Sequence, residues 1–291
     1  MSIVADVLIG ILLLFSVRRL LWVLASWLRR RTPTEAGLWP DVLVAVAFRN
    51  EEDSLPHLLS SLDALNYDAN RLSICLVDDA STDASAGLAV AWARERGSRR
   101  LITLGKNVGK AEALNRALAS AAGKPEVMVV YDADQCPLPN SLRRLIEPFV
   151  DQRTEAVCGY RRPVFLKINA IVAYGCLEAW THQLINLAAK DVLGLNPPTM
   201  GGNCASRRSA LERIGGFPVG SFSEDIEVHW RLPAVVERLD LSATLLPIML
   251  PPTRSGTTSI NGSGGAGGLW RPAAMCADSK LHLWRPVTLI G

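Results

Sequence analysis

Long apolar runs alternate with helical segments in the first half of the chain, and this alternation leaves few possible folds. The apolar runs, typical of strands buried on both faces, lie at 41–48, 72–78, 100–104 and 126–132. The segments with helical apolar spacing lie between them, at 51–65, 84–97 and 110–123. Neighbouring parallel strands need crossovers of about this length. The pattern predicts an α/β fold with a mostly parallel sheet flanked by helices.

The second half of the chain continues with longer helical segments. We expect a helix at 141–151, a strand at 155–164 and an amphipathic helix at 168–190. The apolar stripe of the 168–190 helix is typical of an ordinary core face, and a position at a membrane surface is the alternative.

The N-terminus holds two apolar segments, 3–17 and 20–28, separated by Arg18 and Arg19. Neither segment reaches the roughly 20 residues that cross a bilayer. Together they could span it, or the first could insert while the second lies at the interface; a buried helix is the remaining alternative. No basic region precedes the apolar run, which disfavours a cleaved signal peptide. We predict a transmembrane or interfacial anchor, with the following domain cytoplasmic, as at a bacterial inner membrane.

Composition excludes several classes of protein. The formal net charge is only +3, and no basic segment is interleaved with aromatic residues, so we expect no nucleic-acid partner. Six cysteines occur without a CxxC pair, and four histidines are dispersed. This argues against a zinc site and a disulfide framework, and favours reduced thiols.

Polar clusters follow each predicted strand of the first half. They are "RNEE" at 49–52, "DDASTD" at 78–83, "GKNVGK" at 105–110 and "DADQ" at 132–135. Ligands of open α/β sheets bind beyond the carboxyl ends of the strands. The clusters therefore predict an active site at that edge of the sheet.

Asp132 and Asp134 stand two residues apart at the end of a strand, so their carboxylates point to the same side. Like charges this close oppose each other's ionisation. A hard divalent cation, Mg²⁺ or Mn²⁺, relieves the repulsion and takes its other ligands from water and phosphate. The pair predicts a metal with a diphosphate ligand, although a D-x-D pair also occurs by chance.

The other acidic and basic motifs have ordinary explanations as well. "DDASTD" has the residue types of a helix N-cap, and a phospho-acceptor receiver domain is disfavoured by chain length. Lys106, Asn107 and Lys110 could bind phosphate or be surface residues of a turn. In "SEDIEV", Glu224 and Asp225 fit the first turn of a helix, which is compatible with Asp225 being a general base.

In chain order, the motifs "AFRNEE…VDDASTD…KNVGKAEALN…YDAD…GGNCASRRSALERIGGF…SEDIEV" resemble family 2 glycosyltransferases with the Rossmann-like GT-A fold. The resemblance covers roughly 40–231. Within the family it is greatest to the membrane-embedded synthases of cellulose, hyaluronan and poly-N-acetylglucosamine. It implies inverting, metal-dependent transfer from a nucleotide sugar, with UDP as the expected nucleotide, to a saccharide acceptor. A lipid or lipid-phosphate acceptor, or a nucleotide-sugar-binding protein without activity, is the alternative.

The resemblance also implies a role for each matched residue on the donor side. The residues expected to contact the nucleotide sugar are Asn50, Glu51, Asp78, Asp79, Lys110 and Asp132. Among these, Asp78 and Asp79 match the pair that reaches uracil and ribose. Asp134 matches the aspartate that holds the metal on the diphosphate, with Asp132 as the first aspartate of the same motif.

On the acceptor side, Gly202 and Asn203 fall where the family contacts the acceptor sugar. Asp225 aligns with the catalytic base of the family's "TED" motif and Glu224 with the glutamate before it. Ser223 replaces the threonine. The implied reaction is a single displacement, in which Asp225 takes the proton of an acceptor hydroxyl as that hydroxyl attacks C1 of the donor sugar.

The resemblance ends after Leu232. The family pattern predicts a Q-x-x-R-W motif that closes over the donor and further transmembrane helices, whereas 257–280 is Gly-rich and 243–252 is short and broken by prolines. If the third base of the Ile260 codon begins a new frame, the following codons permit Gln, Arg, Gln, Arg and Trp. We hypothesise a frame shift between about Arg231 and Ile260; a genuinely divergent C-terminus is the alternative. Without the closing motif, catalysis by this chain is predicted to be weak or absent.

These observations divide the chain into four parts. They are a membrane anchor with a basic juxtamembrane segment at 1–31, a linker at 32–40, a glycosyltransferase domain at 41–231 and an atypical tail at 232–291.

Overall fold

A computed structural model of the chain describes most residues of the first 232 and two short strands beyond them. The described residues are 3–28, 39–121, 123, 125–162, 170–195, 201–221, 223–232, 238–241 and 248–249. Most of the predicted linker and tail lies outside these residues, including the Gly-rich segment and much of the interval from Arg231 to Ile260 in which the frame shift is hypothesised.

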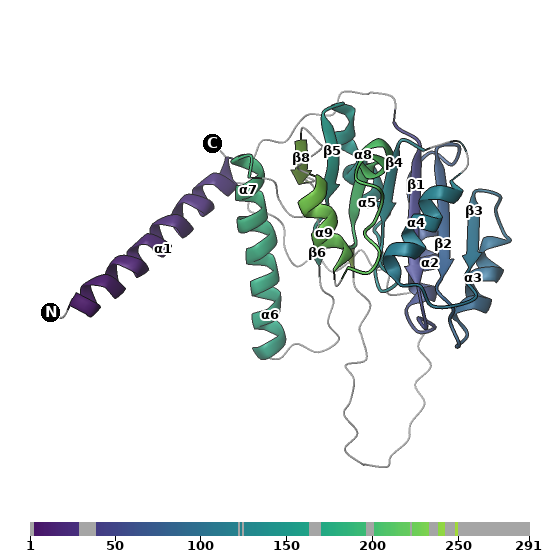
Figure 1. The fold of residues 1–291 in the computed structure, drawn as a ribbon, viewed down its shortest axis with the longest axis horizontal. Helices are drawn as coiled ribbons and strands as arrows, with labels where there is room; N and C mark the ends of the chain where they lie inside the picture. The colour runs from purple at the N-terminus through teal and green to yellow at the C-terminus, as the bar shows by residue number, and fades with distance from the viewer. Residues whose placement is uncertain are drawn as a thin grey trace, which may run out of the picture. The chain divides into compact units, whose positions relative to one another are not determined.

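A seven-stranded sheet with the order β3-β2-β1-β4-β7-β5-β8 forms the centre of the fold (Figure 1). Its strands are β1 (Val42–Phe48), β2 (Leu72–Asp78), β3 (Arg99–Thr103), β4 (Val127–Val130), β5 (Thr154–Cys158), β7 (Cys204–Arg207) and β8 (Arg238–Leu241). The first four in this order are parallel, β7 is antiparallel to β4 and β5, and β8 is parallel to β5. A second sheet pairs β6 (Arg161–Arg162) with β9 (Ile248–Met249). The predicted α/β fold with a mostly parallel sheet is confirmed.

Helices cover both faces of the sheet because side chains of β1 alternate between two apolar clusters. Val44 and Val46 pack with the helices α2 (Leu55–Asp63), α3 (Ser85–Ala93) and α5 (Ser141–Ile146). Leu43 and Ala45 pack with α4 (Lys110–Ser120), α8 (Arg208–Arg213) and α9 (Glu224–Arg231). Burial on both faces explains why the strand sequences are continuously apolar.

The helix boundaries differ modestly from the predicted ones. Helix α2 begins at Leu55 rather than at residue 51, with a proline in its first turn. The predicted 141–151 helix is divided into α5 and the 3₁₀ helix η1 (Glu147–Val150), whose second residue is Pro148. Proline lacks the amide hydrogen that an α-helix needs, which accounts for the change of helix type at Pro148.

The predicted strand at 155–164 is divided into β5 and β6.

Strands β7 and β8 were not predicted from the sequence. Strand β7 spans only four residues, Cys204–Arg207, all buried, in a stretch that carries serine and arginine. Strand β8 follows Arg231, so the main sheet continues beyond the domain boundary predicted at 231. Both strands are short, and their positions depend on pairing with β5 rather than on a local pattern.

The predicted long helix at 168–190 is present in the described residues as three consecutive parts. They are α6 (Ala170–Thr181), the π-helical turn η2 (His182–Leu187) and α7 (Ala188–Val192). The buried Gln183 of η2 accepts a hydrogen bond from the Arg161 N–H at 2.6 Å and donates one to the Arg161 carbonyl at 3.0 Å. This side chain joins the helix to strand β6.

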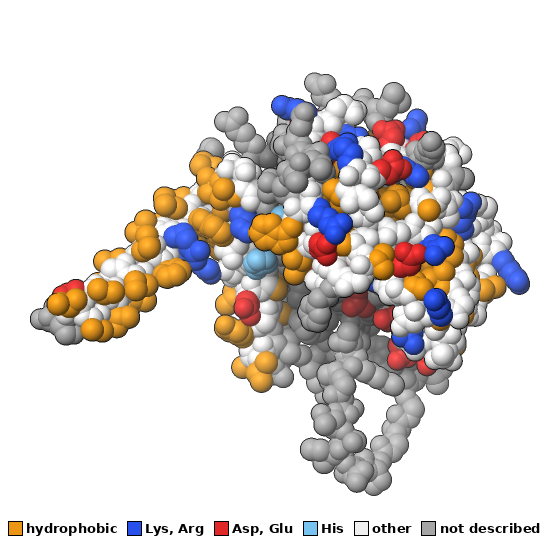
Figure 2. Space-filling model, viewed as in Figure 1, with side chains coloured by type: hydrophobic (Ala, Val, Ile, Leu, Met, Phe, Trp, Pro, Cys, Tyr) orange, Lys and Arg blue, Asp and Glu red, His pale blue; other side chains and the backbone are white. Residues whose placement is uncertain are grey.

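The N-terminal apolar segments form one continuous helix, α1 (Ile3–Trp27), which includes Arg18 and Arg19. Among the described residues it is the one helix long and apolar enough to cross a membrane. Its side chains are mostly exposed, and hydrophobic ones are spread along it in Figure 2. Ala25 is its one buried side chain, in the last turns, and α1 contacts η2 and α7.

Candidate active site

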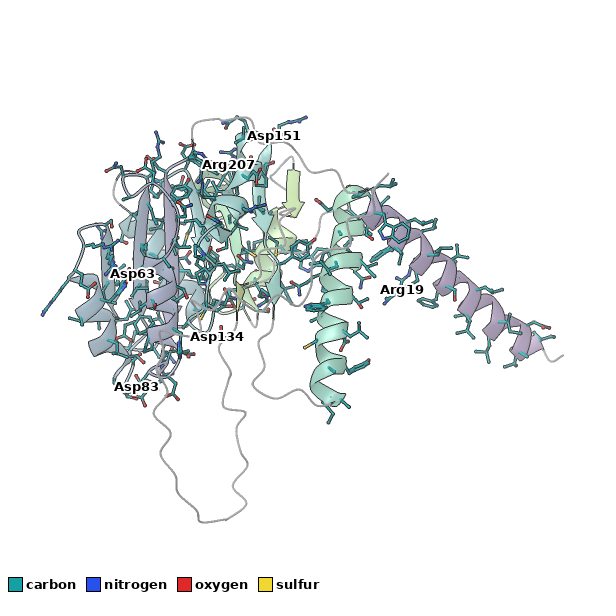
Figure 3. The ribbon with its side chains drawn as sticks, turned by 180° about the vertical axis from the view of Figure 1, so that it is seen from behind. Arg19, Asp63, Asp83, Asp134, Asp151 and Arg207 are labelled. Atoms are coloured by element: carbon teal, nitrogen blue, oxygen red, sulfur yellow. The ribbon has the colours of Figure 1, made fainter. Side chains whose placement is uncertain are left out.

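The loops after β1 and β2 are held together at one edge of the sheet. The Asn50 N–H donates to Ser81 Oγ at 3.1 Å, and Asn50 Oδ1 accepts the Thr82 N–H at 2.8 Å. The Glu51 N–H donates to Ser85 Oγ at 2.8 Å. Figure 3 shows Asp83 of the second loop and Asp134 of the loop after β4 at this same edge. The polar clusters therefore meet where the sequence pattern placed them.

Asp78 and Asp79 organise these loops through backbone hydrogen bonds. Both are buried. Asp78 Oδ1 accepts the Ser81 N–H at 2.9 Å. The two carboxylate oxygens of Asp79 accept the amides of Val108 and Gly109 at 2.7 and 2.9 Å. Asp79 thus fixes the loop that leads into α4, while contacts of the two aspartates with uracil and ribose stay a prediction.

Asp132 is held by Gln135, which was quoted within the "DADQ" motif but given no role there. The Gln135 Nε2 donates to Asp132 Oδ2 at 3.0 Å, and the Gln135 side chain is fully buried. Gly202 lies against the same pair, because a Cβ added there would come within 2.2 Å of Asp132 Oδ2. A side chain at position 202 would displace the aspartate. The spacing of three residues between Asp132 and Gln135 is the sequence signal that could have indicated this contact.

One cleft of about 390 Å³ brings five predicted residues together. Its predicted lining residues are Glu51, Asp79, Lys110, Asp132 and Asp134. Arg49, quoted within the first motif but given no role there, also lines the cleft. The volume lies in the range of small-molecule sites, which is about 300–1,000 Å³. Four carboxylates and two cations in one cleft fit an anionic ligand bound together with a metal ion.

Asp132 is paired with Lys110, whereas the nearest charges around Asp134 are mostly negative. Burial raises the pKa of Asp134 above its usual value, and the negative charges of Asp132 and Glu51 raise it further. Arg161 opposes this shift only weakly, as the smallest of its causes. A divalent cation between Asp134 and a diphosphate would relieve this repulsion.

The donor set at this edge suits a metal that is shared with substrate. Within the described ranges, no group of three or more His, Cys, Asp or Glu side chains could hold a metal ion alone. Mg²⁺ and Mn²⁺ commonly take one or two carboxylates and complete their coordination with water and phosphate oxygens. The carboxylate oxygens of Asp134 and Asp132 are ligands of the kind that such a site uses.

Asp225 lies at the start of α9, and it is not among the residues that line the 390 Å³ cleft. Its Oδ1 accepts the Ser223 hydroxyl at 2.5 Å and the Ile226 N–H at 2.8 Å, and its Oδ2 accepts the Gly201 N–H at 2.9 Å. Burial alone would raise its pKa, but these hydrogen bonds and the charge of Lys110 lower the pKa below its usual value. Asp225 is therefore ionised at neutral pH, as a general base must be.

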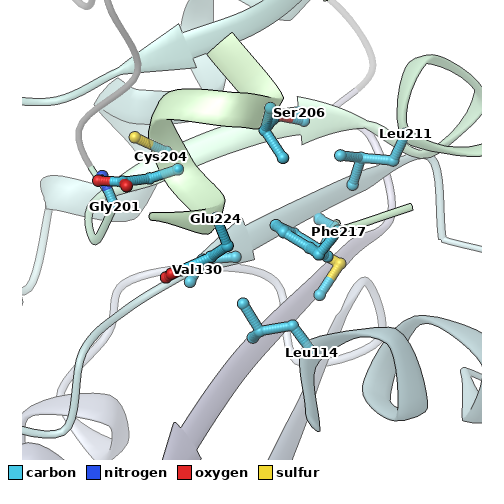
Figure 4. Close-up of a pocket in the computed structure, with 11 residues that line it drawn as sticks. Leu114, Val130, Gly201, Cys204, Ser206, Leu211, Phe217 and Glu224 are labelled. Carbon is cyan, nitrogen blue, oxygen red and sulfur yellow. The ribbon is translucent and has the colours of Figure 1, made fainter. Parts of the chain in front are cut away.

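Glu224 and Asp225 line a second, much smaller cavity of about 30 Å³ between α9 and the sheet (Figure 4). Most of its other walls are apolar, and they include Leu114, Val130 and Phe217. This space is too small for a sugar, since one water molecule occupies about 30 Å³ of liquid. It is a packing gap beneath Asp225.

The two predicted acceptor residues have structural contacts here. Asn203 is buried with a positive φ of 61°, and its Nδ2 donates to the Tyr160 carbonyl at 2.8 Å. A Cβ at Gly159 would come within 2.3 Å of its amide. Asn203 therefore fixes the turn between β5 and β6, and an acceptor contact of Gly202 or Asn203 stays a prediction.

Solved structures share this fold. A mannosyltransferase from Pyrobaculum calidifontis, PcManGT in complex with GDP-Man and Mn²⁺, matches with a TM-score of 0.65 and 23% identity over 82% of this chain and 66% of that one. S. aureus TarS in complex with UDP-GlcNAc is a second match, with a TM-score of 0.53 and 18% identity over 76% of this chain and 62% of that one. The fold is that of the GT-A glycosyltransferases, as predicted.

The family follows from the sequence match. The model of glycosyl transferase family 2 matches residues 43–215, more than half of the chain, so the chain belongs to this family. The predicted family is confirmed, while the finer likeness to polysaccharide synthases stays a prediction.

The names of two curated relatives include a lipid or a lipid phosphate. The beta-monoglucosyldiacylglycerol synthase of Synechocystis sp. is 26% identical over 67% of this chain and 40% of its own length. The undecaprenyl-phosphate 4-deoxy-4-formamido-L-arabinose transferase of Pseudomonas aeruginosa is 32% identical over 60% of this chain and 49% of its own length. The chain thus spans less than half the length of these two relatives.

Proposed function

We propose that this chain binds a nucleoside-diphosphate sugar, with UDP as the nucleotide, and transfers the sugar with inversion in a metal-dependent reaction. The observation that carries the proposal is the junction of two groups of residues. The cleft holds Asp132, Asp134 and Lys110, and the ionised Asp225 stands beside it on α9. Lys110 contacts both Asp132 and Glu224, so the two groups form one site.

In this reaction Asp225 accepts the proton of the acceptor hydroxyl as the hydroxyl attacks C1 of the donor sugar. Ser223 and the Gly201 amide orient the carboxylate. Lys110 supplies positive charge toward the departing diphosphate. Asp134, with Asp132, would hold Mg²⁺ or Mn²⁺, which supplies further positive charge to the leaving group when bound. Fixing donor and acceptor in line contributes by orientation.

A lipid or lipid-linked acceptor is the favoured alternative to a free saccharide. Two curated relatives carry lipid or lipid-phosphate names. In this chain the exposed apolar residues of α6 include Ile171, Tyr174 and Leu177, which are 82%, 68% and 63% exposed. The candidate anchor α1 contacts η2 and α7, and these two elements directly continue α6 along the chain. We propose that α1 and α6 both contact the bilayer, with the catalytic domain on the cytoplasmic side.

Donor binding tests the proposal directly. UDP with Mn²⁺ at about 100 times its Kd should raise the unfolding midpoint by about 5 °C, because ligand bound to the folded state alone stabilises it. EDTA should remove most of the shift, and Mn²⁺ alone should produce little of it. Absence of a shift with UDP or GDP, with either metal, would contradict the proposed donor site. A shift without sugar transfer would favour the binding protein over the enzyme.

The membrane contact of α6 predicts that vesicles protect this helix, a result that insertion of α1 alone would not give. In the full chain, phosphatidylglycerol-containing vesicles should slow amide hydrogen exchange in α6. Tyr174→Glu with Leu177→Glu should reduce that protection by half or more, because burying a carboxylate in an apolar phase is costly. Val219→Glu is the matched control, since Val219 is 59% exposed and lies outside both helices. Equal α6 exchange with and without vesicles in the parent chain would show that α6 stays in water.

A further inference from the structure

Lys110 connects the floor of the donor cleft to the helix that carries the base. It is the first residue of α4. Its Nζ lies 2.6 Å from Asp132 Oδ1 and 3.2 Å from Glu224 Oε1. The three side chains are only 32%, 26% and 21% exposed, so solvent screens these ion pairs less than it screens pairs at the surface. Asp132 follows β4, whereas Glu224 begins α9, nearly a hundred residues later.

Helix α9 is short and depends on contacts with distant residues at its first turn. It spans eight residues, and Val228 is its one buried side chain. A helix this short is not stable by itself, so tertiary contacts must set its position. At its first turn these contacts include the Asp225 bond to the Gly201 amide and the ion pair of Glu224 with Lys110. The position of Asp225 therefore depends on the residue before it.

We propose that Lys110 is a positioning residue, which ties the base-bearing helix α9 to the donor cleft through Glu224. The inference rests on the proposed function for its catalytic meaning, and it assigns to Lys110 a role beyond contact with the donor. An ammonium group has three N–H donors. Asp132 and Glu224 take two of them, and the third remains for an oxygen of the donor diphosphate. Donor binding and the position of α9 are thereby coupled, and linkage makes this coupling reciprocal.

Hydrogen exchange of the full chain tests this role without requiring turnover. Lys110→Met, which keeps the aliphatic stem, and Glu224→Gln should each make the amides of α9 exchange about threefold to fivefold faster, as expected for loss of one ion pair. Because both changes remove the same contact, the double variant should exchange no faster than Lys110→Met alone. Lys110→Arg, which can still bond both carboxylates, should restore most of the protection.

Two controls separate positioning from general damage. Lys106→Met removes a lysine from the same loop and should leave α9 unchanged. Exchange in the central strand β1 (Val42–Phe48) should be the same in all variants, since β1 lies in the core. Faster exchange in β1 would report global destabilisation and would overturn the assignment, because a local tie would not affect that strand.

The coupling predicts one more result. UDP with Mn²⁺ should change the exchange of α9 in the parent chain and should leave it unchanged in Lys110→Met. Without ligand, α9 exchange in Lys110→Met as slow as in the parent chain would overturn the proposal, and so would independent effects of Lys110→Met and Glu224→Gln. The failure of UDP to stabilise the parent chain would instead refute the proposed function, and the ligand-free exchange result would stand apart from it.

Discussion

Asp134→Asn should reduce the affinity of the chain for UDP in the presence of Mn²⁺ on the order of 100-fold. The amide keeps the size of the side chain but removes the charge that would hold the cation on the diphosphate. Titration calorimetry with Mn²⁺, and again with EDTA, measures the loss. In EDTA the variant and the parent chain should bind UDP equally weakly, because the effect depends on the metal.

The same substitution should not destabilise the ligand-free protein. Burial and the charges of Asp132 and Glu51 raise the pKa of Asp134, so its ionised form is less favourable in the folded state than in the unfolded chain. Removing that charge should leave the unfolding midpoint unchanged or raise it. A variant that binds poorly because it is misfolded would show the opposite result, so the two measurements together isolate the metal site.

Asp53→Asn is the matched control for this charge change. Asp53 is exposed and lies in the same loop region as Glu51, but it does not line the cleft. It should bind UDP with Mn²⁺ like the parent chain. Equal losses in both variants would mean that overall charge near the cleft, rather than a ligand at Asp134, determines affinity.

The first half of the fold was predictable because its information is local. Strands β1 and β2 are buried on both faces, which requires unbroken apolar runs, and each is followed by a polar loop. The same rule placed Asp132 and Asp134 at the carboxyl edge of the sheet, and the cleft contains both. Here the apolar runs of the sequence correspond directly to the buried strands of the structure.

The contacts within the site were less predictable because they join distant parts of the chain. The pairing of Lys110 with Glu224, and that of Gly201 with Asp225, depend on where α9 packs. Strand β7 is four residues long, and its sequence has no apolar pattern that would predict a strand. Its pairing nevertheless positions the two residues just before it, Gly202 and Asn203. The residue types indicate what chemistry the site can perform, whereas its hydrogen-bond and ion-pair partners depend on the tertiary structure.

Asp225→Asn should lower turnover by about 10²- to 10⁴-fold, the usual contribution of a general base, with little change in UDP affinity. Asp225 is outside the donor cleft, and its carboxylate is the ionised group placed to take a proton. Release of UDP from a UDP-sugar measures the effect, since it counts transfer to an acceptor and to water. Glu227→Gln, which neutralises another acid of the same helix turn, should retain most of the activity.

The pH dependence gives a sharper test of the base. Burial would raise the pKa of Asp225, but hydrogen bonds from Ser223, Ile226 and Gly201 lower it overall. The carboxylate is therefore ionised throughout the neutral range. At saturating UDP-sugar and Mn²⁺, which keep Asp134 on the metal, turnover should fall as the pH drops through this lowered pKa. Ser223→Ala removes the largest of the lowering contributions, so the fall should move to higher pH while UDP affinity stays constant. An acid limb that does not move in Ser223→Ala would show that another group titrates, and that Asp225 is not the base.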